Sequence, residues 1–281
     1  LAPRQRAPLR QLAFTIQRAL PKNEPAFTLL EAGRQLGGQG LWHLAEHAFQ
    51  QATQLRPDYA EAWAYLGEAV YHNDPEHPEN SLSLLQHALA LDVDSLSANT
   101  FLALYWQRQG DHQQSQTYIQ LAASLDESNT TLQVYLGEIS AQLGDLETAQ
   151  KFYDHAIQLD PYDAVIFQSL AEFSLRYNLD TQQIAIPAAR QAVLLAPNDP
   201  ASLDVMGQVL FRTGDYLNAS RFYFRALEKD SQFPKAHLHL GLLYIFLEET
   251  SQAREHLSLV ITLAPDSASA AHAQRLLNEN S

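Results

Sequence analysis

Apolar residues recur along this chain at helical spacing, in segments separated by short polar breaks. The stretch 130–163 is representative, and its first apolar stripe comprises Leu132, Leu136, Ile139 and Leu143. A second stripe runs from Leu146 to Leu159. Each stripe predicts one face of a helix. Gly144-Asp145 separates them, because glycine suits the left-handed end of a helix and aspartate caps the next helix. The pattern predicts a helix, a tight turn and a second helix.

Small residues recur at a nearly constant interval across the whole chain. The first row, spaced by 34 or 36 residues, is Gly33, Gly67, Ala103, Gly137, Ala171, Gly207 and Gly241. A second row follows as Ala45, Ser81, Ser115, Ala149, Ala185, Ala219 and Ala253. Glycine within a helix costs about 0.8–1.0 kcal/mol relative to alanine, so its repeated use requires a packing explanation. We expect these small side chains to let paired helices cross closely.

The residues around the small positions resemble the tetratricopeptide repeat (TPR), a helix–turn–helix unit. The opening of the repeat is matched by Trp63, Leu66, Gly67, Leu136, Gly137, Leu240, Gly241 and Tyr244. Its second half is matched by Ala45, Phe49, Ala52, Pro57, Ala149, Tyr153, Ala156 and Pro161. The resemblance implies an all-α fold, a right-handed superhelical α-solenoid of antiparallel helix pairs.

The spacing divides the chain into seven TPR-like repeats with a segment at each end. The repeats are 26–59, 60–95, 96–129, 130–163, 164–199, 200–233 and 234–267. Residues 1–25 are interpreted as a tail and a capping or linker helix. Residues 268–281 are expected to form a C-terminal capping helix, because terminal repeats need a polar outer face.

Repeats 60–95 and 164–199 are two residues longer than the others. The interval between their two small positions is also longer, so we expect the extra residues in the turn between the paired helices, around 73–79 and 178–180. Insertions in repeat arrays often map to a binding side. The alternative is drift in a surface loop, which is thermodynamically cheap.

Composition narrows the classes of partner and chemistry. The chain has 18 Lys+Arg against 32 Asp+Glu, a net charge of -14, which argues against nucleic-acid binding because that requires basic residues against phosphate. It contains no cysteine, which excludes disulfides and thiolate chemistry. It has no run of 18 apolar residues, so we expect no membrane insertion by this segment. We expect a cytoplasmic location, although the chain begins at Leu1 and an upstream signal or anchor could be missing.

One short motif could indicate chemistry. His43, Glu46 and His47 fit the H-x-x-E-H signature of zinc peptidases. However, Ala45 falls on the second row of small residues, so an ordinary repeat helix already explains the segment. We therefore predict a protein that is not an enzyme and has no metal or cofactor. The alternative, a metal-dependent hydrolase at these three residues, requires that the protein binds zinc.

The resemblance also implies a binding surface, because TPR proteins bind peptides or partner helices on a concave face lined by the first helix of each repeat. The positions carried over are Arg34, Glu68, Tyr71, Arg108, Glu138, Glu172, Arg176, Asp204, Phe211, Arg212, Leu238, Leu242 and Phe246. Two alternatives stay open. Glu172 and Arg176 are four residues apart and could pair along their own helix. The apolar groove at Leu238, Leu242, Ile245 and Phe246 could be covered by the terminal helix.

The sequence thus predicts a protein–protein interaction scaffold or adaptor that binds a peptide or helix of a partner protein. The alternative is a non-catalytic TPR region of a larger enzyme or signalling chain, truncated at residue 1. The sequence leaves the identity of the partner and the oligomeric state open.

Overall fold

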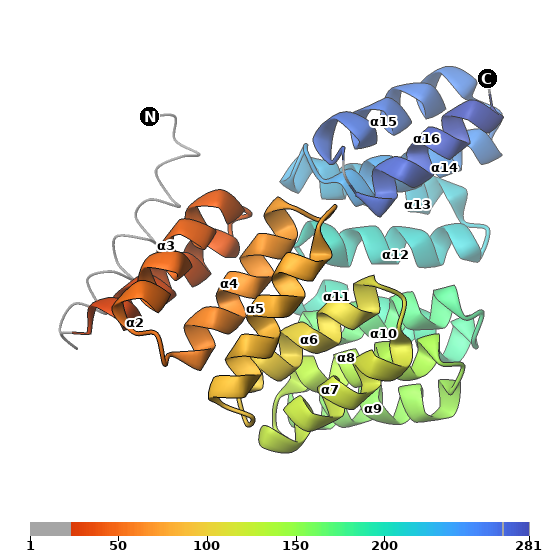
Figure 1. Cartoon of the computed structure of the whole chain (residues 1–281). Helices are drawn as coiled ribbons and strands as arrows, with labels where there is room; N and C mark the ends of the chain where they lie inside the picture. The colour runs from red at the N-terminus through yellow and green to blue at the C-terminus, as the bar shows by residue number, and fades with distance from the viewer. Residues whose placement is uncertain (1–23, 266, 281) are drawn as a thin grey trace. The chain divides into compact units, whose positions relative to one another are not determined.

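The computed structural model describes residues 24–265 and 267–280, and every regular element in these ranges is helical (Figure 1). The prediction of an all-α repeat solenoid is confirmed. The chain forms two compact units, unit 1 (Leu1–Ala149) and unit 2 (Gln150–Ser281). The tail and helix predicted over 1–25 lie outside the described residues, apart from the last two positions.

The helices follow one another with short connections. Those of unit 1 are α2 (Pro25–Gly37), α3 (Trp42–Leu55), α4 (Ala60–Asn73), α5 (Pro78–Leu91), α6 (Leu96–Arg108), α7 (His112–Leu125) and α8 (Thr130–Gln142). The helix α9 (Leu146–Leu159) contains the boundary between the units. Those of unit 2 are α10 (Ala164–Arg176), the π-helix η2 (Thr181–Ala185), α11 (Ile186–Leu195), α12 (Pro200–Arg212), α13 (Tyr216–Lys229), α14 (Pro234–Phe246), α15 (Thr250–Leu263) and α16 (Ala268–Glu279).

The predicted glycine–aspartate turns are confirmed. Gly110, Gly144 and Gly214 have φ of 78°, 89° and 84°, the left-handed region that glycine adopts without a steric cost. The next residue in each turn is an aspartate whose carboxylate caps the following helix. Asp111, for example, accepts a hydrogen bond from the Gln114 backbone N–H at 3.0 Å. These local signals end the first helix of a pair and begin the second.

Small residues lie where paired helices cross. A Cβ atom on Gly67 would lie 2.8 Å from Leu85 Cγ, and one on Gly241 would lie 2.6 Å from Leu257 Cδ2. At Gly33 and Gly207 a Cβ would overlap the rings of Phe49 and Tyr223. Members of the second row are at most 3% exposed. The expectation that small residues permit close crossings is confirmed at these four glycines.

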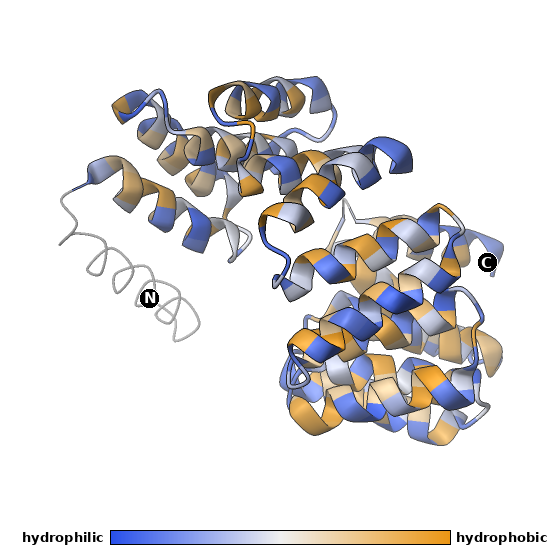
Figure 2. Ribbon diagram, turned by 90° about the horizontal axis from the view of Figure 1, so that it is seen from below, coloured by the Kyte–Doolittle hydropathy of each residue, from blue (hydrophilic) through white to orange (hydrophobic). Residues whose placement is uncertain are grey.

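Apolar faces between neighbouring helices make the core of each unit. In unit 1, one cluster joins Leu30 of α2 and Phe49 of α3 to Leu66 of α4. In unit 2, another joins Tyr223 of α13 to Leu240 and Leu243 of α14. Figure 2 shows hydrophobic and hydrophilic residues side by side on individual helices, as expected for helices with one buried face. Within the described ranges, no helix is long and apolar enough to cross a lipid bilayer.

The prediction that the extra residues of the two longer repeats lie in the turns is only partly right. The turns after α4 and α10 contain four residues, whereas those after α6, α8, α12 and α14 contain three. The second extra residue of repeat 60–95 lengthens α4 to 14 residues. In repeat 164–199 the second extra residue is accommodated by η2, because the wider π-turn keeps later side chains in register. Ala185 therefore stays fully buried at its small-residue position.

A substitution pair in repeat 26–59 tests the close crossing. Gly33→Ala places a methyl group against the buried Phe49 ring, and we expect the free energy of unfolding to fall by about 1–3 kcal/mol. Gly38→Ala is the matched control, because Gly38 has helical φ and its nearest atom would be 3.4 Å away. Urea unfolding monitored by circular dichroism measures both variants. Equal effects of the two substitutions would contradict the packing argument.

Candidate functional site

The predicted groove residues all lie on the first helices of the pairs. In unit 1, α4 contacts α2 and α6 directly, and in unit 2, α12 contacts α10 and α14. The first helices α2, α4 and α6 therefore form one surface in unit 1, and α10, α12 and α14 form one in unit 2. We call this surface of each unit the first-helix face. The polar contacts on this face differ between the two units.

In unit 1, the first-helix face contains an ion pair between repeats. Arg108 of α6 donates to both carboxylate oxygens of Glu68 on α4, at 2.9 and 2.6 Å. The Arg108 guanidinium lies over the Tyr71 ring, 4.6 Å from its centroid. His72 Nε2 lies 3.1 Å from Glu68 Oε1. The planar guanidinium satisfies the carboxylate in two places and joins two repeats.

This environment changes the acidity of Glu68. The side chain is 8% exposed, and burial alone raises the pKa of a carboxyl group. Hydrogen bonds from His72 and Arg108, with the charge of Arg108, outweigh that effect and lower the pKa of Glu68 below its ordinary value of 4.5. Glu68 is therefore an internal carboxylate, and the solvent-facing groups of this cluster belong to Arg108, His72 and Tyr71.

The remaining predicted residues of unit 1, Arg34 and Glu138, are more exposed than Glu68. Arg34 Nη1 lies 2.9 Å from Glu31 and 3.8 Å from Glu61, so it connects α2 with α4. Its guanidinium also lies 5.1 Å from the centroid of the Tyr65 ring. Glu138 is half-buried on α8.

In unit 2, the first-helix face contains a cavity of about 310 Å³. Its lining comprises Glu172, Leu175 and Arg176 of α10, Gln208 of α12, Lys235, Leu238 and His239 of α14, and Ser269 of α16. Lys235 Nζ lies 3.0 Å from Glu172 Oε1, so this ion pair links α10 to α14 across one repeat. Cationic, anionic and apolar groups thus converge on one concave site, as is common in ligand sites.

Asp204 holds two of the polar side chains that line this cavity. It is 1% exposed, accepts a hydrogen bond from Gln208 Nε2 at 3.0 Å, and lies 2.8 Å from His239 Nδ1. The His239 ring also stacks on Tyr223 of α13, with the ring centroids 5.7 Å apart. The side chains of Gln208 and His239, which line the cavity, are therefore held in place within the protein.

The structure brings some predicted residues together and separates others. Glu172, Arg176 and Leu238 line the cavity, and Asp204 lies beneath it. Glu172 forms its ion pair with Lys235, and no pair between Glu172 and Arg176 is recorded among the described residues. Arg212 donates instead to Asn178 in the turn after α10.

Two predicted aromatic residues form a separate cluster in unit 2. Phe211 and Phe246 are 5.8 Å apart between ring centroids, and Phe246 lies 4.6 Å from Tyr216. Phe246 remains 55% exposed. This cluster lies where α12 and α14 end, whereas the cavity residues of α14 (Lys235, Leu238 and His239) lie in the first half of that helix.

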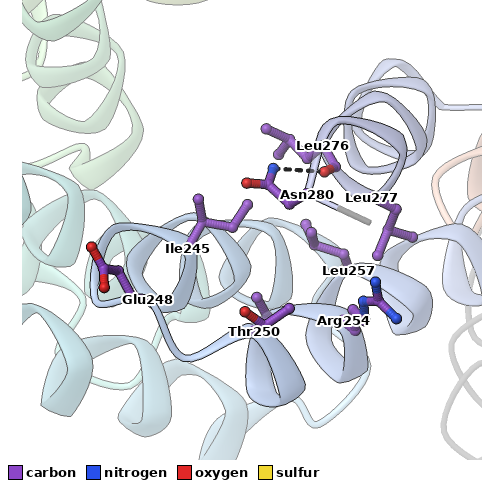
Figure 3. A pocket seen from close by; sticks show the side chains of 9 residues that line it. Ile245, Glu248, Thr250, Arg254, Leu257, Leu276, Leu277 and Asn280 are labelled. Atoms are coloured by element: carbon purple, nitrogen blue, oxygen red, sulfur yellow. Dashed lines mark hydrogen bonds between the residues drawn. The ribbon is translucent and has the colours of Figure 1, made fainter.

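The terminal helix α16 covers the apolar groove that the sequence left open. Leu238 packs against Leu257, Val260 and Ala273 and is 7% exposed, while Leu242 is partly buried against the same cluster. A smaller cavity of about 170 Å³ remains between α14, α15 and α16. Figure 3 shows Ile245, Leu257, Leu276 and Leu277 around it. Of the predicted apolar groove, Phe246 alone has a mostly exposed side chain.

Among the residues that line this cavity, sequence reasoning missed Leu175, Gln208, Lys235, His239 and Ser269. Lys235 lies in the first turn of α14. At the equivalent position of the repeat, the other first helices carry unrelated residues. Its one signal is that the two other lysines in the described part of the chain, Lys151 and Lys229, lie on second helices of the pairs. The ion pair joins residues 63 positions apart, so no local pattern predicts it.

The H-x-x-E-H motif lies in α3. Glu46 accepts hydrogen bonds from Gln50 at 3.0 Å and from Asn73 of α4 at 2.6 Å, while Ala45 is fully buried at the helix crossing. Through its hydrogen bond with Asn73, Glu46 links repeat 26–59 to repeat 60–95. In the part of the chain that the structure describes, no group of three or more His, Cys, Asp or Glu is placed to hold a metal ion.

The Glu68 ion pair predicts a pH-dependent loss of stability. Because the folded pKa of Glu68 is lowered, its contribution is present above pH 4.5 and is lost as pH falls through the lowered value. We expect Glu68→Gln to lower the free energy of unfolding by about 1–3 kcal/mol near neutral pH. The deficit should shrink in acid, which urea unfolding at about pH 7 and about pH 3 measures. Glu76→Gln, at an exposed turn position, is the control. A deficit that does not change with pH would contradict the assignment.

Comparisons with known proteins agree with the helix pairs and crossings described above. Tetratricopeptide repeat family models match residues 30–92, 134–163 and 234–267. A search of curated protein sequences finds no match.

Several solved structures share the fold. A chain of the APC/C hetero-tetramer Cut9-Hcn1 is 18% identical with a TM-score of 0.74, and the match covers 97% of this chain and 52% of that chain. Yeast Tom70 is 15% identical with a TM-score of 0.69, covering 98% and 59%. A tetratricopeptide repeat protein from Parabacteroides merdae is 12% identical with a TM-score of 0.70, covering 91% and 98%. The chain thus spans little more than half the length of the first two. The solved structures thus share the fold, and the family matches identify this chain as one that contains tetratricopeptide repeats.

Proposed function

We propose that this chain is a non-catalytic scaffold that binds an extended peptide or a helix of a partner protein on the first-helix face of unit 2. TPR repeats generally mediate protein–protein interactions. The observation that carries the proposal is the cavity between α10, α12 and α14, with its Lys235–Glu172 ion pair. The net charge of -14 further favours protein partners over nucleic acids.

The cavity is suited to a peptide because two of its polar side chains are already held in place without a ligand. Asp204 holds both Gln208 and His239, so a ligand would bind them with little loss of side-chain entropy. Leu175 supplies an apolar contact beside these groups. The mixture provides hydrogen bonds for a peptide backbone and one pocket for a side chain.

The Lys235–Glu172 pair supplies charges that can change partner. Lys235 is 51% exposed and Glu172 is 32% exposed, and such partly solvated pairs contribute about 0–1 kcal/mol. Opening the pair therefore costs little. Lys235 can then bind a carboxylate of the partner, while Glu172 binds an amine or a backbone N–H.

Charge reversal at Lys235 tests this proposal. Peptides are first selected from a phage-displayed library against the full chain, and their affinities are then measured by isothermal titration calorimetry. We expect Lys235→Glu to weaken the selected peptides about tenfold or more, equivalent to about 1.4 kcal/mol. Lys229→Glu is the matched control, because Lys229 is exposed on the second helix α13. Peptides that bind both variants as tightly as the unsubstituted chain would overturn the proposal.

A further inference from the structure

A second cavity in unit 2 lies away from the first-helix face and has no part in the proposed function. It has a volume of about 360 Å³ and lies between α9, α10 and the η2–α11 segment. Apolar side chains line one part of it, among them Phe167, Ile184 and Pro187. Gln150 and Asp154, one turn apart on α9, supply polar groups.

The cavity depends on the extra residue of repeat 164–199. The π-helix η2 contributes Gln183 and Ile184 to its lining. Asp180 fixes the start of η2 by accepting hydrogen bonds from the backbone N–H groups of Gln182 and Gln183, each at 3.0 Å. Single π-turns within helices frequently occur at functional sites. Repeat 60–95 has an extension of the same length but lengthens α4 instead, so the extension by itself does not require a π-turn.

Gln150 presents an unsatisfied acceptor at this cavity. Its Nε2 donates to Asp154 Oδ1 at 3.0 Å, and this bond fixes which end of the amide is the oxygen. The Oε1 atom is buried, and none of the residues that the structure describes donates a hydrogen bond to it. A buried acceptor without a donor is unfavourable and calls for an explanation. A ligand that donates a hydrogen bond would satisfy it.

Asp154 specifies the charge of such a ligand. Its side chain is exposed, and within the described ranges it has no ion-pair partner. The carboxylate retains acceptor capacity beyond its bond with Gln150. The unsatisfied Oε1 atom of Gln150 and the carboxylate of Asp154 lie one helical turn apart. Together they favour a cationic ligand group with several hydrogen-bond donors.

We propose that this cavity binds an arginine side chain from a partner protein. The aliphatic stem lies against Phe167, Ile184 and Pro187. The guanidinium donates to Gln150 Oε1 and to the Asp154 carboxylate, since its donors are arranged in a planar fork that can reach two acceptors together. The net charge of -14 attracts basic segments to the protein.

Methyl and amide NMR of the full chain tests this site with the probe acetyl-Leu-Arg-Leu-amide. We expect saturable shifts of the Ile184 methyl signal and of the Gln150 and Asp154 amide signals. The same peptide with citrulline in place of arginine has similar shape but no charge, and should bind about tenfold more weakly. Equal binding of the two peptides, or shifts confined to the residues around Lys235, would overturn the proposal.

Variants separate binding from folding. Asp154→Asn should weaken the arginine probe about tenfold. Gln150→Met removes the orphan acceptor and should weaken the probe without lowering the melting temperature. Glu228→Gln, on the exposed side of α13, is the matched control and should leave affinity unchanged. Lys235→Glu should also leave it unchanged, which distinguishes this site from the first-helix face. Wild-type affinity in Asp154→Asn would refute the assignment.

Discussion

The close crossing of paired helices at small residues is the constraint on which the rest of this structure depends. Gly33 and Gly207 leave room for the rings of Phe49 and Tyr223, while Gly67 and Gly241 leave room for leucines. The small residue on the first helix and the large one on the second are complementary in volume, as ridges and grooves require. Repetition of this contact sets the same arrangement of helices in successive pairs.

This arrangement separates two kinds of surface. Neighbouring first helices touch within each unit, so charges on different repeats come together. Glu68 and Arg108 pair between adjacent repeats, and Glu172 and Lys235 pair across an intervening one. The carboxylate of the first pair is largely buried and the pair contributes to the protein's own stability, whereas the second pair is partly solvated, and we propose that its charges bind a ligand. Burial, rather than repeat position, distinguishes the structural ion pair from the one that we propose for binding.

The sequence predicted the features that depend on local chemistry. Apolar spacing, the glycine–aspartate turns and the small residues all act within one helix pair, so they specify helix boundaries and crossings directly. The cavity on the first-helix face of unit 2 could be predicted only in part, through Glu172, Arg176 and Leu238. Lys235 and Ser269 reach it from distant repeats, and the cover that α16 provides over Leu238 depends on tertiary packing. The π-helix also escaped prediction, because a single added residue can lengthen a turn, lengthen a helix or widen a helical turn.

A double-mutant cycle at one crossing tests the central claim most directly. Gly207→Ala and Tyr223→Leu are made singly and together, and the free energy of unfolding of each variant is measured in urea. If the crossing is limited by volume, the smaller partner relieves the added methyl group, and the double variant is more stable than the sum predicts by about 0.5–3 kcal/mol. Effects that add to within about 0.3–0.5 kcal/mol would contradict the account.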